Sequence, residues 1–376
     1  MTLINYLTRV HFADGVLEEA IHSEMEANGK RRPLIIAEEG HLTGATAERF
    51  FSSFPRRSRA EVFSDVPLQA TETAARRVAE LYRDGECDLI IAFGSNRAMD
   101  LAKVSRIAIT FDEPIAALSN DEGGSQRING QLPLFFSVPG ILGFASAISD
   151  YTRVKLDAGG QVLLSSRHLI PVVTICDPTL TLGASATDSA TAAAGILARS
   201  IDSFLSPSYN PPADAMAVDA LARVTTSAAR AIADDDLKAR REMMAGGLNS
   251  SLSLQKGLCV VHAICNAIAS ASSGRLDPST LGGVMIPRLV DFYGELANGR
   301  AEPLRKSLNI ASGADLSEGV EALMSDWPMP RRLSDLGVDE GLYDQISVSA
   351  AADRAIDNGP RRFTAEEIRK ILASAH

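Results

Sequence analysis

The stretch that decides the fold is CDLIIAFGSNRAMDLAKVSRIAI, residues 87–109. It begins with an uninterrupted apolar run, passes through a glycine at position 94, and continues with the apolar spacing of a helix. A strand, a tight turn and a helix in this order form the first part of a βαβ unit. A strand without polar alternation is typical of a parallel sheet that is covered on both faces.

Apolar runs of the same kind recur through the first half of the chain, and a helical pattern at 70–86 lies between them. The predicted strands are RRPLIIAEEG (31–40), EPIAALSN (113–120), LPLFFSVPG (132–140) and LIPVVTICDP (169–178). This alternation predicts an α/β domain with a parallel sheet, similar to a dinucleotide-binding domain, over residues 1–180.

After about residue 180 the β-branched runs disappear, and the apolar patterns have the period of helices. The predicted helices cover residues 188–205, 213–235, 256–272 and 365–376. We therefore expect an all-α domain over residues 181–376. Because open parallel sheets bind ligands beyond the carboxyl ends of their strands, the expected active site is a cleft between the two domains.

Composition limits the partners and the compartment. The chain has 376 residues and a net charge of −10, which argues against nucleic acid or an anionic membrane surface as a standing partner. No stretch approaches the roughly 20 apolar residues of a membrane span, and the first residues lack the apolar region of a signal peptide. The cysteines lack CxxC spacing and are expected to be free, buried thiols in a reducing cytoplasm. They are Cys87, Cys176, Cys259 and Cys265.

The turn after the 87–94 strand is a candidate phosphate-binding site. Gly94 permits a tight turn, and the amide groups at the start of the following helix can hold a phosphate. Asp100 and Lys103 follow one turn into this helix. A single glycine is equally compatible with an ordinary strand-to-helix turn.

Two further residues can be read in two ways. Glu38, at the end of the first clear strand, could accept hydrogen bonds from an adenosine ribose and repel a 2′-phosphate, or it is simply a solvated acid. His262 lies in an apolar helix, with Cys259 and Cys265 three residues to either side. A metal site there would need a fourth ligand that the sequence does not offer, and a lone histidine in this setting is usually a core residue.

Taken together, these segments resemble the iron-containing (group III) alcohol dehydrogenase superfamily, and they are most similar to its maleylacetate reductase branch. The resemblance implies the dehydroquinate synthase-like fold of that superfamily, dependence on NAD or NADP, a small carbonyl substrate and a homodimer. The segments that carry it are 8–36, 88–103, 136–149, 169–183, 199–217, 329–343 and 358–372.

The resemblance also assigns cofactor positions in two loops. Asn96 and Arg97 stand where the first loop of the family has glycine and serine, although Arg97 could contact the pyrophosphate as a cation. Other positions in these two loops keep the family pattern. Those assigned to cofactor binding are Gly94, Ser95 and Asp100 in the first loop, and Gly143 and Ser146 in the second.

The metal positions depart from the family pattern. The resemblance places Gly195 at the metal aspartate, Arg199 at the first metal histidine and Pro278 near the last one, and only His262 retains a ligand. A further active-site histidine of the family falls on Asn266. Because zinc or iron needs three or four lone-pair donors, we expect no bound metal.

The predicted function is NAD(P)-dependent reduction of a small, anionic carbonyl or keto-acid substrate without a metal. Arg199 and His262 are the candidates for polarising the carbonyl, since a guanidinium can hydrogen-bond a carbonyl or carboxylate. Arg199 could instead form a salt bridge with a nearby acid, such as Asp202 or one across the cleft. Two alternatives stay open. One is a non-redox protein that binds a small anion or a partner, and the other is a non-redox enzyme that anchors a carboxylated substrate on Arg97 and Arg199.

Overall fold

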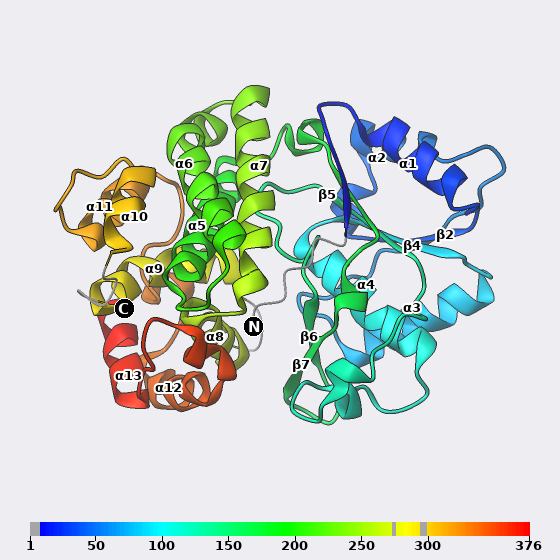
Figure 1. Cartoon of the computed structure of the whole chain (residues 1–376). Coiled ribbons are helices and arrows are strands. Elements are labelled where there is room, and N and C mark those ends of the chain that lie inside the picture. The colour runs from blue at the N-terminus through cyan, green and yellow to red at the C-terminus, as the bar shows by residue number, and fades with distance from the viewer. Residues whose placement is uncertain (1–7, 273–275, 294–298) are drawn as a thin grey trace. The chain divides into compact units, whose positions relative to one another are not determined.

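The computed structural model describes residues 8–272, 276–293 and 299–376. The described chain divides into two compact units, one that extends to Leu182 and one that begins at Gly183. Each unit is described by itself below (Figure 1).

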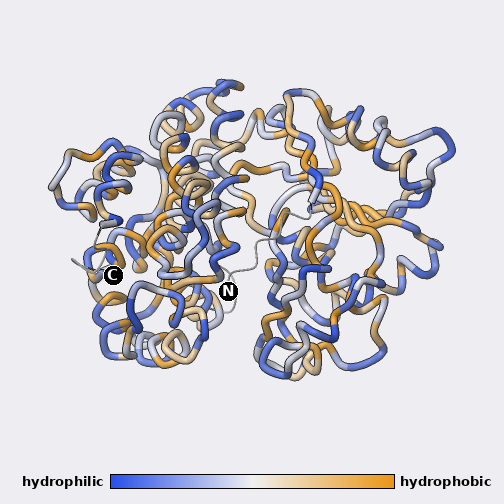
Figure 2. Tube along the Cα trace, viewed as in Figure 1, coloured by the Kyte–Doolittle hydropathy of each residue, from blue (hydrophilic) through white to orange (hydrophobic). Residues whose placement is uncertain are grey.

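The first unit is built on a six-stranded parallel sheet with the strand order β1-β8-β5-β4-β2-β3. Its central strands are buried along their whole length, which explains their continuous apolar sequences. Figure 2 shows these strands as the most continuous hydrophobic part of the unit. The strands are β1 (Arg9–Phe12), β2 (Pro33–Ala37), β3 (Glu61–Phe63), β4 (Leu89–Gly94), β5 (Phe135–Pro139) and β8 (Val173–Cys176).

Helices cover both faces of this sheet (Figure 1). Alternate strand residues such as Ile35 and Ile91 pack with Leu17, Ile21 and Phe50 from the helices on one face. The other face is covered by the pair of helices that follow β3 and β4. The helices of the unit are α1 (Leu17–Ala27), α2 (Gly44–Ser52), α3 (Glu72–Asp84) and α4 (Asn96–Thr110). The predicted α/β architecture with a parallel sheet is confirmed.

One predicted strand was wrong. Residues 113–120 form a short 3-10 helix, η2 (Ile115–Leu118), instead of a strand. Pro114 precedes this turn and has no N–H for a strand ladder, and the Ala-Ala pair within it has little preference for strands. A two-stranded antiparallel hairpin, β6 (Tyr151–Lys155) and β7 (Gln161–Ser165), was not predicted.

In its described residues the second unit contains helices and no strand, as predicted. The long helix α5 packs against α6, α7, α8 and α9. Side chains that accept hydrogen bonds from the first amides fix several helix starts, among them Ser185, Asn210 and Asp236. The helices are α5 (Ala186–Leu205), α6 (Pro211–Ala233), α7 (Leu237–Ser253), α8 (Val260–Ala271), α9 (Pro278–Tyr293), α10 (Ala301–Ser307), α11 (Leu316–Met324), α12 (Tyr343–Ala352) and α13 (Ala365–Ser374).

The described chain also tests the expectations for membrane spans and for cysteines. No single helix is long and apolar enough to cross a membrane, and only one pair, bent by 100° between Leu237–Lys256 and Val260–Ala271, passes this test by length and composition together. All four cysteines are free and buried, as the sequence predicted.

Candidate active site

One group of predicted residues lies in the first unit, at the turn between β4 and α4. β4 ends at Gly94, whose φ of +120° is a conformation that side chains other than glycine rarely adopt. Ser95 caps α4 by accepting a hydrogen bond from the Arg97 amide at 3.2 Å. Glu38, which directly follows β2, accepts hydrogen bonds from the Ser95 amide at 3.3 Å and from the Ser95 hydroxyl. A carboxylate therefore lies at the positive end of α4, where the helix dipole favours an anion.

Two basic side chains flank Glu38. His41 Nδ1 lies 3.5 Å from one carboxylate oxygen, and Arg97 Nε lies 3.5 Å from the other. The Glu38 side chain is only 13% exposed, so it is not the solvated acid that was one reading of the sequence. A Cβ at Gly94 would lie 2.6 Å from Glu38 Oε2 and 2.8 Å from His41 Nδ1. The turn therefore brings together four predicted residues, Glu38, Gly94, Ser95 and Arg97.

Asn96 joins this turn to the second loop. Its Oδ1 accepts hydrogen bonds from the amides of Ala145 at 2.8 Å and Ser146 at 3.0 Å. The two segments also meet where the Gly140 amide donates to the Gly94 carbonyl at 2.9 Å. Asn96, at a position where the resemblance predicts glycine, thus accepts two hydrogen bonds that a glycine side chain could not accept.

Asp100 lies beneath the second loop, one turn into α4. Thr152 Oγ1 donates to Asp100 Oδ1 at 3.2 Å, and the Ser146 hydroxyl also bonds to this carboxylate. Burial raises the pKa of Asp100, while the Lys103 charge and these two hydroxyls act in the opposite direction. Ser146 itself is buried, as is Gly143. Asp100 and Ser146 are thereby engaged in holding the loop to the helix.

Lys103 is wholly buried. Its Nζ donates to Ser149 Oγ at 2.6 Å and to the Tyr151 carbonyl at 3.0 Å. Burial lowers the pKa of Lys103 to about 8, against the opposing effect of the nearby Asp100 and Asp150 charges. The structure therefore places this lysine under the hairpin start, and its role toward a cofactor stays a prediction.

A second, separate group of predicted residues is in the helical unit, on α5. Gly195 faces the start of α9 closely enough that an added Cβ would lie 2.6 Å from Ser279 Cβ and 3.2 Å from Arg199 Nη1. Ser279 and the Arg199 guanidinium thus occupy the space beside the glycine. A side chain as large as aspartate would have to displace α9 locally.

Arg199 and His262 belong to helices that meet at one point. Gly282 of α9 faces Ala198 of α5 and Val261 of α8, so that an added Cβ would lie 3.0 Å from Ala198 Cβ and 3.8 Å from Val261 Cγ1. Arg199 and His262 are the next residues of α5 and α8, and both are partly exposed. The packing of α9 against both helices therefore holds the two predicted residues on neighbouring helices.

Asp202 ties α5 to α8 directly. It is 3% exposed and accepts hydrogen bonds from the Tyr293 hydroxyl and the Val261 amide, both at 2.8 Å. Burial raises its pKa to about 7, and these two hydrogen bonds act against that rise. The carboxylate is engaged by Tyr293 and Val261, and a salt bridge between Arg199 and a nearby acid stays a prediction.

Comparison with known proteins places these features in a family. The sequence pattern of "Iron-containing alcohol dehydrogenase" matches residues 8–178, and that of "Fe-containing alcohol dehydrogenase family, C-terminal" matches residues 189–376. The chain belongs to the iron-containing alcohol dehydrogenase family. It is an oxidoreductase of the type that this family represents.

Individual members of the iron-containing alcohol dehydrogenase family align over the whole chain. A 4-hydroxybutyrate dehydrogenase of Cupriavidus necator is 31% identical over 99% of both chains. The structure of a 1,3-propanediol oxidoreductase has a TM-score of 0.92 at 20% identity and full coverage of both chains. A sulfoacetaldehyde reductase from Bifidobacterium kashiwanohense in complex with NAD+ has a TM-score of 0.89 at 19% identity, covering 100% of this chain and 98% of that one. The maleylacetate reductase of Agrobacterium tumefaciens has a TM-score of 0.80 at 21% identity, with 100% and 98% coverage.

The metal that the family name implies can be tested against the donors present. At the positions that the resemblance assigns to ligands, Gly195 and Pro278 have no donor atom, and Arg199 carries a permanent positive charge. Across the described ranges, no three His, Cys, Asp or Glu side chains gather in a way that could hold a metal ion. These residues do not fit a divalent cation.

The groups at the start of α4 fit the dinucleotide that family members use better than the residues above fit a metal ion. The start of α4 offers amide groups, the absent side chain of Gly94 and the Arg97 guanidinium, all of which suit a phosphate. Glu38 competes for the Ser95 amide and hydroxyl. A phosphate bound to Ser95 would therefore require the Glu38 carboxylate to turn away.

The structural roles of several residues in these two groups were missed from the sequence. Asn96 carried a signal, because an asparagine beside a turn often accepts backbone amides. Ser279 and His41 gave none, since their importance comes from what lies opposite them in space. Asp202 was named only as a possible partner for Arg199, although an acid within an apolar helix stretch often indicates a buried polar network.

Proposed function

We propose that the chain is an NAD(P)-dependent oxidoreductase that interconverts a small hydroxy acid and the corresponding carbonyl acid without a bound metal. The observation that carries this proposal is the anion-accepting turn at the start of α4, where Glu38, Ser95 and Arg97 converge. The alignment with a 4-hydroxybutyrate dehydrogenase over the full length supports a small hydroxy acid as the substrate class.

In this proposal the cofactor supplies the hydride, and the chain binds and orients it. The Ser95 amide and the Arg97 guanidinium hold the pyrophosphate. Glu38, released from Ser95, accepts hydrogen bonds from the adenosine ribose, and its charge disfavours a 2′-phosphate. The proposed cofactor is therefore NAD in preference to NADP.

The substrate is proposed to meet Arg199 and His262. A guanidinium presents a planar fork of donors that matches a carboxylate or a carbonyl oxygen. It polarises or anchors the substrate by hydrogen bonding, in place of a metal ion. His262 is the candidate donor of the proton that the carbonyl oxygen gains on reduction.

The first experiment is titration of the purified chain with NADH and with NADPH, followed by fluorescence, together with measurement of bound iron and zinc. We expect NADH to bind more tightly than NADPH, and less than one metal ion per ten chains. One tightly bound iron or zinc per chain would refute the metal-free mechanism. Failure of both nucleotides to bind at about millimolar concentration, which is roughly −4 kcal/mol, would favour the alternative of a non-redox ligand-binding or partner protein.

The second experiment tests Arg199 once turnover with a hydroxy acid such as 4-hydroxybutyrate has been measured. Arg199→Ala should lower kcat/KM by about thirtyfold or more, corresponding to about 2 kcal/mol for a desolvated charge contact. Arg230→Ala removes an exposed arginine that pairs with Asp236 and serves as the matched control. Equal kcat/KM in both variants would contradict the role of Arg199.

Two further proposals concern the setting of the protein. We infer a cytoplasmic location, which suits four free, buried thiols. We also infer a homodimer, which size-exclusion chromatography with light scattering tests.

A further inference from the structure

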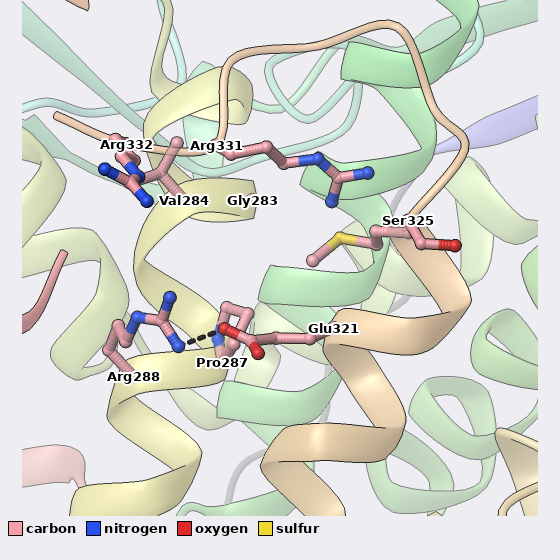
Figure 3. Close-up of a pocket in the computed structure, with 9 residues that line it drawn as sticks. Gly283, Val284, Pro287, Arg288, Glu321, Ser325, Arg331 and Arg332 are labelled. Carbon is pink, nitrogen blue, oxygen red and sulfur yellow. Dashed lines mark hydrogen bonds and ion pairs between the residues drawn. The ribbon is translucent and has the colours of Figure 1, made fainter. Parts of the chain in front are cut away.

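A pocket with charged and apolar lining residues lies wholly within the helical unit. It has a volume of about 290 Å³ and is formed between α9, α11 and the segment that follows α11. Three guanidinium groups and one carboxylate line it: Arg288, Arg331, Arg332 and Glu321. Figure 3 shows Arg288 and Arg332 on the same side of the pocket and Arg331 extended toward the α11 side. This local excess of positive charge contrasts with the net charge of −10 of the chain.

The three arginines differ in how their charges are used. Arg288 Nη1 forms an ion pair with Glu321, the dashed contact in Figure 3. Neither Arg331 nor Arg332 has a carboxylate within 4 Å among the described residues. Arg331 Nη2 is buried and has no hydrogen-bond acceptor in the described part of the chain. Burying a guanidinium nitrogen without an acceptor is costly, so this donor is poised for one from outside the chain.

The backbone that carries Arg331 and Arg332 is held in place by its neighbours. Both backbone amides donate to Asp335 Oδ2 at 3.0 Å, so this carboxylate is used by the main chain and not by the guanidiniums. Met329, two residues before Arg331, packs so closely on Gly283 that an added Cβ there would lie 2.6 Å from its Cε. The pocket is therefore built on a fixed frame, which reduces the cost of ordering on binding.

We propose that this pocket binds a small dianion through Arg331, Arg332 and the free side of Arg288. The ligand chemistry is that of two or three closely spaced acceptor oxygens, as in a phosphate monoester or a short dicarboxylate. Guanidinium forks match both groups in a bidentate manner. Burial lowers the pKa of Arg331, partly offset by Glu321 and Asp326, and a bound anion would stabilise its charged form.

The size of the pocket limits the ligand. A volume of about 290 Å³ lies just below the range for small-molecule sites, roughly 300–1,000 Å³. It admits a metabolite of a few carbon atoms and excludes a dinucleotide. The site is thus distinct from the turn at the start of α4, and its ligand does not have to be the substrate.

The test is isothermal titration of the full-length protein with inorganic phosphate and, separately, with succinate, at constant ionic strength set by chloride. We expect saturable binding of at least one of them, with one site per chain and a Kd of about 1 mM or below. Binding of phosphate alone would identify phosphate monoesters as the ligand class of the pocket, and binding of succinate would identify dicarboxylates. Absence of saturable binding of both dianions up to about 50 mM overturns the proposal, because such a site would be too weak to be specific.

Two variants locate the binding. Arg331→Met should weaken the Kd by about tenfold or more, because it removes the buried donor. Arg332→Met removes an exposed side chain, so it keeps the fold, and should weaken the Kd by about threefold or more. Arg369→Met is the matched control on α13, with the same change of charge, and should stay within about twofold. Wild-type affinity in Arg332→Met overturns the proposal, since the dianion then binds elsewhere, for example at Ser95.

Discussion

The carboxylate of Asp202 provides the sharpest quantitative prediction. In the folded chain burial raises its pKa from the ordinary 3.8 to about 7. Between pH 4 and pH 7 the unfolded chain therefore releases this proton while the folded chain keeps it, and the free energy of unfolding falls as the pH rises. Above pH 7 the group is ionised in both states and the loss is complete. A shift of about 3 pKa units, at about 1.4 kcal/mol each, makes the total loss about 4 kcal/mol.

Asp202→Asn removes this proton linkage while keeping an acceptor for the Val261 amide. The free energy of unfolding of the variant minus that of the wild type should therefore increase by about 4 kcal/mol from pH 4 to pH 8. Carboxyl groups with lowered pKa values, such as Glu24, act equally in both proteins and cancel in this difference.

The assay is urea unfolding at a series of pH values, followed by the fluorescence of Trp327, the one tryptophan of the chain, which is buried in the helical unit. Asp291→Asn, at an exposed position of α9, is the matched control, because it removes a carboxyl group from the same unit without touching the contacts of Asp202. A difference for Asp202→Asn that stays constant within about 1 kcal/mol between pH 4 and pH 8 would refute the reasoning, because the pKa of Asp202 would then be near its ordinary value.

Three further predictions concern close contacts. Asn96→Ala should lower the free energy of unfolding by about 2 kcal/mol, because two loop amides lose their acceptor, whereas Asn96→Asp, which keeps an acceptor, should lose less; urea unfolding of both variants checks this. Gly94→Ala should lower the free energy of unfolding by about 1–3 kcal/mol and weaken NADH binding, because the φ of Gly94 is +120° and the new Cβ meets Glu38. Fluorescence titration checks the binding, and an unchanged nucleotide affinity would contradict the assignment of this turn. Gly195→Ala should lower the free energy of unfolding by about 1–3 kcal/mol, because the new Cβ overpacks against Ser279, and adding Ser279→Gly should recover most of this loss. If thermal unfolding shows that the double variant loses the sum of the two single losses, the contact is contradicted.

The architecture could be predicted from the sequence because its elements carry strong local patterns. The continuous apolar runs at 87–94 and 132–140 became the central strands β4 and β5, and the helical periods after residue 180 became helices. The failure at 113–120 has a local cause, since a short apolar run after a proline forms a turn as readily as a strand. The β6–β7 hairpin was missed because its strands have weak polar alternation and are joined by an ordinary glycine turn.

The candidate site was less predictable, since it depends on what lies opposite each residue. Motif reasoning selected Glu38, Ser95 and Arg97, which the structure brings together. It could not show that the Lys103 ammonium points into the interior, or that Ser279 fills the space at Gly195. Such facts depend on contacts between segments that are distant in sequence, and no local spacing encodes them.

The bond from Asn96 to the amides of residues 145 and 146 has a consequence for the exchange of parts between relatives. The two loops form a matched pair, in which the side chain of one completes the main chain of the other. If a glycine-rich first loop from a homologue replaced this one without its companion segment, the amides of residues 145 and 146 would lose their acceptor. Both loops would then be held less firmly. Chimaeras in this part of the molecule should exchange the two segments as a single cassette.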